Sequence, residues 1–200
     1  KLIRFEHNDL KDLENKILQF NSTQKSILII VESLYSMEGS IAPLKEIIRI
    51  CKKYNVQLLV DEAHALGVLG PGGKGLSFDF SNEITMLTGT FGKSFGSGGA
   101  FIACNSKIGE YLIQTSGAFR YTTALSPALA AGALKSLQKI KSNKEWGINL
   151  LNTSKKWKKE ILQNLNYPVR GDSQILSIVT GQEEKTIQLQ KYLEKNGFLA

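Results

Sequence analysis

The sequence predicts an α/β protein with a mostly parallel sheet and helices on both faces, followed by the start of a small α+β domain. Two observations lead to this prediction. Short apolar runs rich in β-branched residues recur along the chain, and segments of helical periodicity separate them. Strands that alternate with helices usually form a parallel sheet that is covered on both sides.

The first of these segments can be assigned in chain order. Asp9 and Asn8 offer an N-cap for a helix over residues 10–20. Pro43 begins a second helix, with apolar residues at helical spacing. Strands are predicted at residues 26–33, 56–61, 84–89 and 100–104. A further helix, capped by Asn105 or Ser106, is predicted through residue 114.

The character of the chain changes near residue 144. Ser126 and Pro127 begin a long helix that is rich in Ala and Leu and ends near residue 141. Beyond it come a Lys- and Asn-rich helix to about 165, a strand at 174–179 and a helix at 183–195. We therefore expect residues 1–144 to be part of a large domain and residues 145–200 to be part of a small C-terminal domain. Lys1 is not an initiator methionine, and we expect the chain to be a fragment of a longer protein.

Composition narrows the classes of function. The chain has 200 residues and a formal net charge of +7. Its lysines fall mostly in helical stretches such as KKWKK at 155–159, so a solvated helix face is favoured over a nucleic-acid patch. A positive field also suits acidic substrates such as phosphates or coenzyme A esters. No apolar run approaches the roughly 20 residues of a membrane span.

Cys51 and Cys104 show neither ligand spacing nor a disulfide framework. Free thiols of this kind are typical of a reducing compartment, and we expect a cytoplasmic protein. A metal site is not expected, because the Asp61–His64 pair has no third histidine or cysteine near it.

The chemistry-bearing residues follow the ends of the predicted strands. Asp61 and His64 occur in VDEAH at 60–64, and Lys93 occurs in the glycine-rich stretch TGTFGKSFG at 88–96. A lysine amine can form a Schiff base, and a carboxylate can keep a pyridinium nitrogen protonated. Because parallel sheets bind ligands beyond the carboxyl ends of their strands, we expect Glu32, Asp61, His64 and Thr90 to share one site.

Together, these segments resemble the α-oxoamine synthases, a family of pyridoxal-phosphate (PLP) enzymes of fold type I. The resemblance covers almost the whole chain and is weakest after residue 145. The matching motifs are VESLYSMEG at 31–39, APL at 42–44, VDEAH at 60–64, GVLG at 67–70, GKG at 73–75, TGTFGK at 88–93, YTT at 121–123 and SP at 126–127.

The resemblance implies a role for each matching residue. Lys93 matches the lysine that binds PLP covalently, Asp61 the aspartate that pairs with the pyridine nitrogen, and His64 the histidine that hydrogen-bonds the ring 3-oxygen. The remaining matches are Ser36 near that oxygen, Thr90 as a phosphate-binding hydroxyl, and Thr122 or Thr123 as a phosphate contact across a dimer interface. Glu32 matches an acid at the pocket edge and receives no role.

The implied reaction is the decarboxylative condensation of an amino acid with an acyl-CoA, with L-alanine and a pimeloyl thioester as the expected pair, in a homodimer. Members that use glycine or serine share the same motifs, so the substrates stay open. A PLP-dependent aminotransferase or lyase, a non-catalytic homologue and a basic nucleic-acid-binding module are the competing hypotheses. The resemblance also places a ring-stacking histidine before Lys1 and a carboxylate-binding arginine after Ala200.

Overall fold

The computed structural model describes residues 1–21, 26–164 and 167–199, and these divide into two compact units. The first unit comprises Lys1–Tyr35 and Ile41–Ile148. The second comprises Asn149–Ala200 together with the short segment Ser36–Ser40. The sequence did not predict that five residues from the loop after the first strand would group with the C-terminal part.

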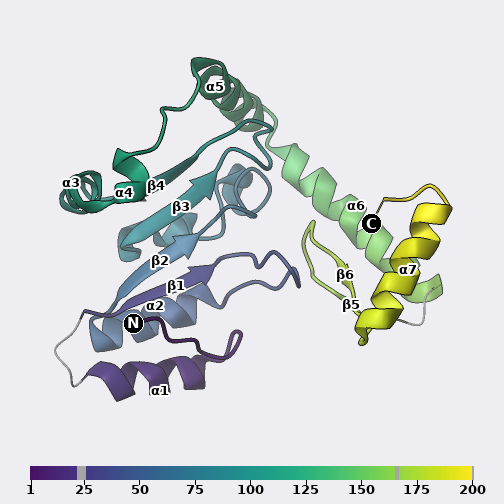
Figure 1. The fold of residues 1–200 in the computed structure, drawn as a ribbon, viewed down its shortest axis with the longest axis horizontal. Helices are drawn as coiled ribbons and strands as arrows, with labels where there is room; N and C mark the ends of the chain where they lie inside the picture. The colour runs from purple at the N-terminus through teal and green to yellow at the C-terminus, as the bar shows by residue number, and fades with distance from the viewer. Residues whose placement is uncertain (22–25, 165–166, 200) are drawn as a thin grey trace. The chain divides into compact units, whose positions relative to one another are not determined.

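The first unit contains a four-stranded sheet in the order β1-β2-β3-β4 (Figure 1). Its strands are β1 (Leu28–Glu32), β2 (Gln57–Asp61), β3 (Met86–Thr90) and β4 (Ala100–Cys104). β1, β2 and β3 run parallel, whereas β4 is antiparallel to β3. All four strands were predicted, and each differs from its predicted bounds by at most two residues.

One face of the sheet carries the core of this unit. Ile29 and Val31 of β1, and Leu58 and Val60 of β2, are buried and alternate with exposed or half-buried residues. Alternation with period two sends these four side chains to one face. Ile30 and Ile102, by contrast, are more than half exposed.

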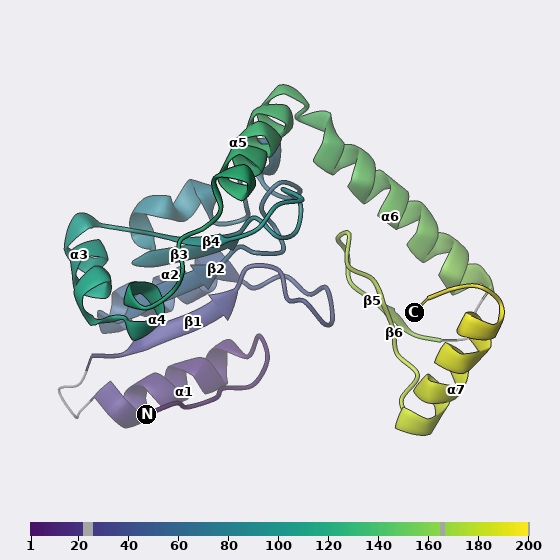
Figure 2. The same ribbon diagram turned by 45° about the horizontal axis from the view of Figure 1, so that its top comes forward.

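Helices α1 (Leu10–Asn21) and α2 (Leu44–Tyr54) cover the buried face (Figures 1 and 2). Asp9 caps α1, because its Oδ1 accepts hydrogen bonds from the backbone N–H groups of Lys11 and Asp12. In α2 the apolar residues recur at helical spacing and are buried against the sheet; they are Leu44, Ile47, Ile48 and Cys51. The capping and the periodicity are those that the sequence predicted.

The rest of the first unit consists of η1 (Pro71–Gly73), η2 (Phe78–Glu83), α3 (Ser106–Thr115), α4 (Gly117–Arg120) and α5 (Pro127–Ser142). The predicted cap of α3 is confirmed, since Asn105 accepts a hydrogen bond from the backbone of Ile108. Ser126 makes no such side-chain bond at α5, which begins instead with Pro127. A proline at this position has no N–H that would need a partner.

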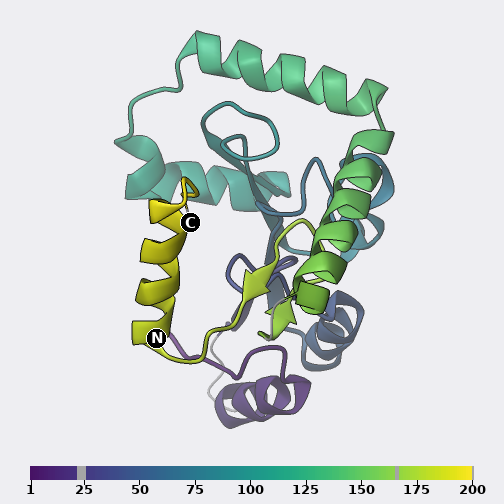
Figure 3. The ribbon, with the colours of Figure 1, turned by 90° about the vertical axis from the view of Figure 1, so that its right-hand side faces the viewer.

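The second unit is α+β, as the sequence predicted. It contains α6 (Glu145–Asn164, which begins in the first unit), an antiparallel pair of β5 (Val169–Arg170) and β6 (Ser177–Ile178), and α7 (Glu183–Lys195) (Figure 3). The strand predicted at 174–179 is shorter, because the Ser173 hydroxyl accepts from the Ile175 backbone and holds a turn there. Arg170 pairs with Glu38 at 2.9 Å, which ties the 36–40 segment to this unit.

Candidate active site

A row of polar residues crosses the sheet at the carboxyl ends of its parallel strands. Glu32 at the end of β1 is the register partner of Asp61 at the end of β2, and Asp61 is in turn the partner of Thr88 on β3. Side chains in register on parallel strands point to the same face. The structure therefore brings together Glu32 and Asp61, which lie 29 residues apart in the sequence, as the topology predicted.

His64 is held above this row by a tight turn. The Oδ1 atom of Asp61 accepts a hydrogen bond of 2.7 Å from the backbone N–H of Ala63. The carbonyl of Glu62 accepts from the backbone N–H groups of Ala65 and Leu66, at 3.0 and 2.9 Å. The chain thus turns immediately after the strand, and Asp61 and His64 are fixed in one local framework.

Lys93 lies in a loop that closes between β3 and β4. Backbone bonds from Phe91 to Gly99 and from Ser97 to Phe91 close the loop at its base. Phe95 is buried, and its ring lies 5.4 Å from that of Phe91, which anchors the tip. The Lys93 side chain itself is exposed, so its amine is available to a ligand.

The loop and the turn meet at two contacts. Nζ of Lys93 lies 2.5 Å from Nε2 of His64. The neighbouring Ser94 hydroxyl donates to the Leu66 carbonyl at 2.6 Å. A Cβ on Gly67 would lie 2.4 Å from the Ser94 oxygen, so only glycine allows this approach.

Electrostatics make His64 a weak base. Burial lowers the pKa of His64, and the Lys93 ammonium beside it lowers this pKa further. The carboxylates of Glu32 and Asp61 act in the opposite direction, but the net shift is downward. A neutral imidazole can accept a hydrogen bond from Lys93 at Nε2 and still donate one from its other nitrogen.

One buried polar atom beside Asp61 has no partner. The Oγ1 atom of Thr88 is buried and makes no hydrogen bond within the described residues. Buried hydroxyl groups are normally satisfied by the protein, by water or by a ligand. An exposed amine, a carboxylate and an unsatisfied hydroxyl on one side of the sheet fit a polar aromatic cofactor such as PLP.

The remaining predicted residues lie in other environments. The Thr90 hydroxyl donates to the Gly99 carbonyl at 3.1 Å and accepts from the Gly92 N–H at 3.2 Å, so a phosphate contact requires it to rotate. Thr122 and Thr123 are exposed between α4 and α5, and neither hydroxyl is hydrogen-bonded within the described part of the chain. Ser36 is exposed and belongs to the second unit.

Glu62 and Ser33, which lie beside the predicted site residues, were not predicted from the sequence. Both side chains are fully buried, and the Ser33 hydroxyl donates to the Glu62 carboxylate at 2.7 Å. Strand alternation gives a usable signal: Glu62 follows Asp61, so it must point to the core face. A buried carboxylate there requires hydrogen-bond donors around it.

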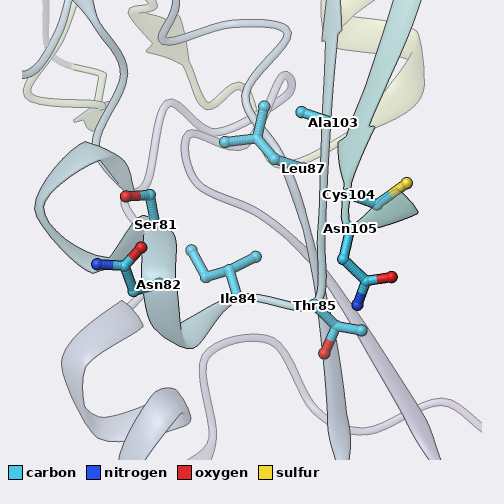
Figure 4. A pocket seen from close by; sticks show the side chains of 8 residues that line it. All are labelled: Ser81, Asn82, Ile84, Thr85, Leu87, Ala103, Cys104 and Asn105. Atoms are coloured by element: carbon cyan, nitrogen blue, oxygen red, sulfur yellow. The ribbon is translucent and has the colours of Figure 1, made fainter. Parts of the chain in front are cut away.

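A cavity of about 410 Å³ lies elsewhere in the first unit (Figure 4). Cys104 and Asn105 line it together with Thr85, which precedes β3, and Leu87 of β3. It contains none of Lys93, His64 and Asp61. No group of three His, Cys, Asp or Glu residues that could hold a metal ion occurs among residues 1–21, 26–164 and 167–199. Within the same ranges, every helix is too short or too polar to cross a membrane.

Comparison with known families shows to which family the chain belongs. The model of the family described as "Aminotransferase class I and II" matches residues 1–199. The chain belongs to this family. Among curated proteins, a putative 8-amino-7-oxononanoate synthase of Glaesserella parasuis is 34% identical over 198 residues, covering 98% of this chain and 52% of that protein.

Solved structures share the fold of this aminotransferase class I and II member. A serine palmitoyltransferase from S. paucimobilis with bound PLP and myriocin superposes with a TM-score of 0.89 at 27% identity, covering all of this chain and 52% of that one. An 8-amino-7-oxononanoate synthase from Francisella tularensis gives 0.79 at 29% identity, covering all of this chain and 58% of that one.

These relatives confirm the predicted fold class, the resemblance to the α-oxoamine synthases, and PLP as the cofactor. The chain spans about half the length of the curated relatives that it matches.

Proposed function

We propose that the protein catalyses the decarboxylative condensation of an amino acid with an acyl-CoA thioester. The observation that carries this proposal is the 2.5 Å contact between Lys93 Nζ and His64 Nε2, beside the Asp61 carboxylate. PLP supplies an electron sink for charge that develops at the amino acid's Cα. The protein must then anchor the cofactor, hold its ring nitrogen protonated and move a proton at Cα.

Each of these tasks suits one residue of the cluster. Lys93 is the covalent anchor, and its amine, once released, takes or returns the proton at Cα. Asp61 keeps a proton on the pyridine nitrogen, because an opposite charge close by favours the charged form. His64 donates a hydrogen bond to the ring 3-oxygen from its neutral form, which its lowered pKa supports.

For substrates, we propose L-alanine and a pimeloyl thioester, the pair used in biotin biosynthesis. The stretches FRYTTA at 119–124 and TFGK at 90–93 resemble those of 8-amino-7-oxononanoate synthase. The 34% identity to a relative of that name supports the same choice. The proposal includes a homodimer in which Thr122 or Thr123 contacts the phosphate in the other subunit's site. It also includes Ser36 near the ring oxygen. A cytoplasmic location and a large domain that ends near residue 144 complete it.

The test uses the full-length protein that contains this chain. With PLP bound, alanine and pimeloyl-CoA should release free CoA and CO₂ in equal amounts. Lys93→Ala should remove both this turnover and the visible absorbance of lysine-bound PLP. Lys107→Ala, a change at an exposed lysine of α3, is the matched control and should leave both intact. If Lys93→Ala retained the lysine-bound absorbance, the assignment of Lys93 would be wrong.

A second candidate is an α-oxoamine synthase of another specificity, such as a serine palmitoyltransferase. The TM-score of 0.89 with an enzyme of that name favours it. Product analysis separates the two. Serine with palmitoyl-CoA would release CoA in this case, whereas alanine with pimeloyl-CoA would not. A transaminase would convert alanine to pyruvate without releasing any thiol.

A further inference from the structure

Glu62 is a fully buried carboxylate that the proposed reaction does not use. It directly follows Asp61, so its side chain points to the opposite, core side of the strand end. Within the described part of the chain it takes part in no ion pair. A buried, unpaired carboxylate is costly unless hydrogen bonds compensate the loss of water.

Three donors from two other segments surround this carboxylate. Its Oε1 atom accepts from the backbone N–H of Ser77 at 2.6 Å. Its Oε2 atom accepts from the hydroxyl of Ser33 at 2.7 Å and from the backbone N–H of Leu76 at 3.2 Å. Both oxygens must act as acceptors, which an ionised carboxylate does and an amide cannot do.

Through these bonds Glu62 joins the end of β2 to the end of β1 and to the loop at 70–77. Gly75 makes the approach possible, because a Cβ there would lie 2.8 Å from the Glu62 carboxyl carbon. Two backbone hydrogen bonds connect this loop to the segment that follows His64. The Gly75 N–H donates to the Leu69 carbonyl, and the Gly67 N–H donates to the Gly73 carbonyl at 2.7 Å.

These hydrogen bonds also connect to the loop that carries Lys93. Gly67 directly follows Leu66, whose carbonyl accepts the hydrogen bond from Ser94, the residue next to Lys93. A continuous set of hydrogen bonds thus runs from the Glu62 carboxylate through the 70–77 loop and the His64 turn to the lysine loop. The His64 turn and the lysine loop, which this set of bonds connects, also meet directly at the contact between Lys93 and His64.

We propose that Glu62 is a positioning residue that sets the approach of His64 to Lys93 by clamping the 70–77 loop beneath the His64 turn. This deepens the proposed function, on which it rests. Proton transfer and covalent anchoring both depend on the placement of the lysine amine, and an error of about 1 Å can cost about 100-fold in rate. Loss of the clamp should therefore lower kcat more than it changes KM.

The experiment uses the full-length protein and four variants. Glu62→Gln keeps the shape of the side chain but loses one acceptor, and Glu62→Ala loses both. Ser33→Ala removes only the hydroxyl donor. Glu110→Gln, at an exposed position of α3, is the matched control. For each variant we would measure Tm, kcat and KM for the amino acid, and the NMR titration of His64 in the protein without PLP.

We expect Glu62→Gln to lower kcat by about 10- to 100-fold with KM changed less than about threefold. Ser33→Ala should have a smaller effect in the same direction, and Glu110→Gln none. In Glu62→Gln the titration midpoint of His64 should move up towards that of a free imidazole, because Lys93 moves away while Glu32 and Asp61 stay.

A purely structural role would give a different result. Glu62→Gln and Ser33→Ala would then lower Tm but leave both the His64 midpoint and kcat at wild-type values, and the proposal would be wrong. Because the His64 titration needs neither PLP nor substrate, it tests the clamp even if no condensation activity is found. Conversely, a wild-type protein without Lys93-dependent absorbance would refute the proposed function and leave the clamp intact.

Discussion

Nζ of Lys93 and Nε2 of His64 lie 2.5 Å apart, although 29 positions separate the two residues in the chain. The lysine comes from the loop between β3 and β4, and the histidine from the turn after β2. A protonated Lys93 amine donates in this contact, and the Nε2 atom of a neutral imidazole accepts. A proton on both groups at once would be strongly unfavourable at this distance.

His64 should therefore titrate below the usual histidine range. Burial and the Lys93 ammonium both lower its pKa, outweighing Glu32 and Asp61. NMR of the imidazole protons in the protein without PLP measures the midpoint directly. Lys93→Met removes the second cause and should raise the midpoint, though not fully, because burial persists. A midpoint that does not change in Lys93→Met would mean that the contact is absent in solution.

The same shift makes stability depend on pH. The pKa of His64 is lower in the folded than in the unfolded chain, so the unfolded state binds a proton first. Above the ordinary histidine pKa of about 6.5, His64 does not change the free energy of unfolding with pH. As the pH falls from there through the pKa of His64 in the folded protein, the free energy of unfolding decreases. Urea unfolding between pH 7.5 and 5 should show this slope. His64→Gln should reduce it, with His7→Gln as the comparison.

Asp61→Asn should fold normally but lose activity in the full-length enzyme. The amide oxygen can still accept the hydrogen bond from Ala63, so the turn is preserved. The negative charge is lost, and kcat should fall by about 100-fold or more. Asp79→Asn, an exposed residue of η2, is the control and should match the wild type. If Asp61→Asn kept the wild-type kcat, the proposed role of Asp61 in the site would be wrong.

Gly75→Ala should destabilise the protein by about 2–4 kcal/mol, the sum of backbone strain and overpacking. Its φ is +93°, and the added Cβ would meet the buried Glu62 carboxylate. Gly181→Ala is a matched control, because its φ is +81° and no atom lies within 4 Å of the added Cβ. The control should cost about 1 kcal/mol. Equal losses in urea unfolding would mean that the contact with Glu62 contributes nothing.

The two cysteines should differ sharply in reactivity. Burial raises the pKa of the Cys51 thiol to about 11, so only about one molecule in a thousand is thiolate at pH 8. Cys104 is half-buried at the end of β4. A thiol reagent such as DTNB should therefore modify one thiol quickly, and Cys104→Ser should abolish the fast phase. A fast phase that survives Cys104→Ser would show that Cys51 is accessible.

Local sequence patterns were sufficient for most of the fold. Alternating apolar residues in β1 and β2, the helical spacing in α2 and the cap at Asn105 act over a few neighbouring positions, so they could be read directly. Two short elements that lack such local signals were not predicted from the sequence. The helix α4 is only one turn long, and the strand β5 has two residues.

Some features of the candidate site could likewise be predicted from local sequence patterns, and others could not. Motifs in the sequence predicted PLP as the cofactor and Lys93, Asp61 and His64 as its site, because short runs of residue types carry that chemistry. Strand order predicted that Glu32 and Asp61 would meet, since carboxyl ends of parallel strands share an edge. The sequence could not predict that Ser36 would group with the C-terminal unit, since that depends on packing between segments far apart in the chain.

The sequence by itself determined which elements form and which groups can do chemistry, because propensity, periodicity and residue type are local properties. Only the tertiary structure decided that His64 meets Lys93, and that Glu62 binds the 70–77 loop. It also decided that the buried Thr88 hydroxyl has no hydrogen-bond partner among the described residues. The His64 and Glu62 contacts join segments 14 or more residues apart. They follow from how the loops close over the sheet, and no short stretch of sequence contains that information.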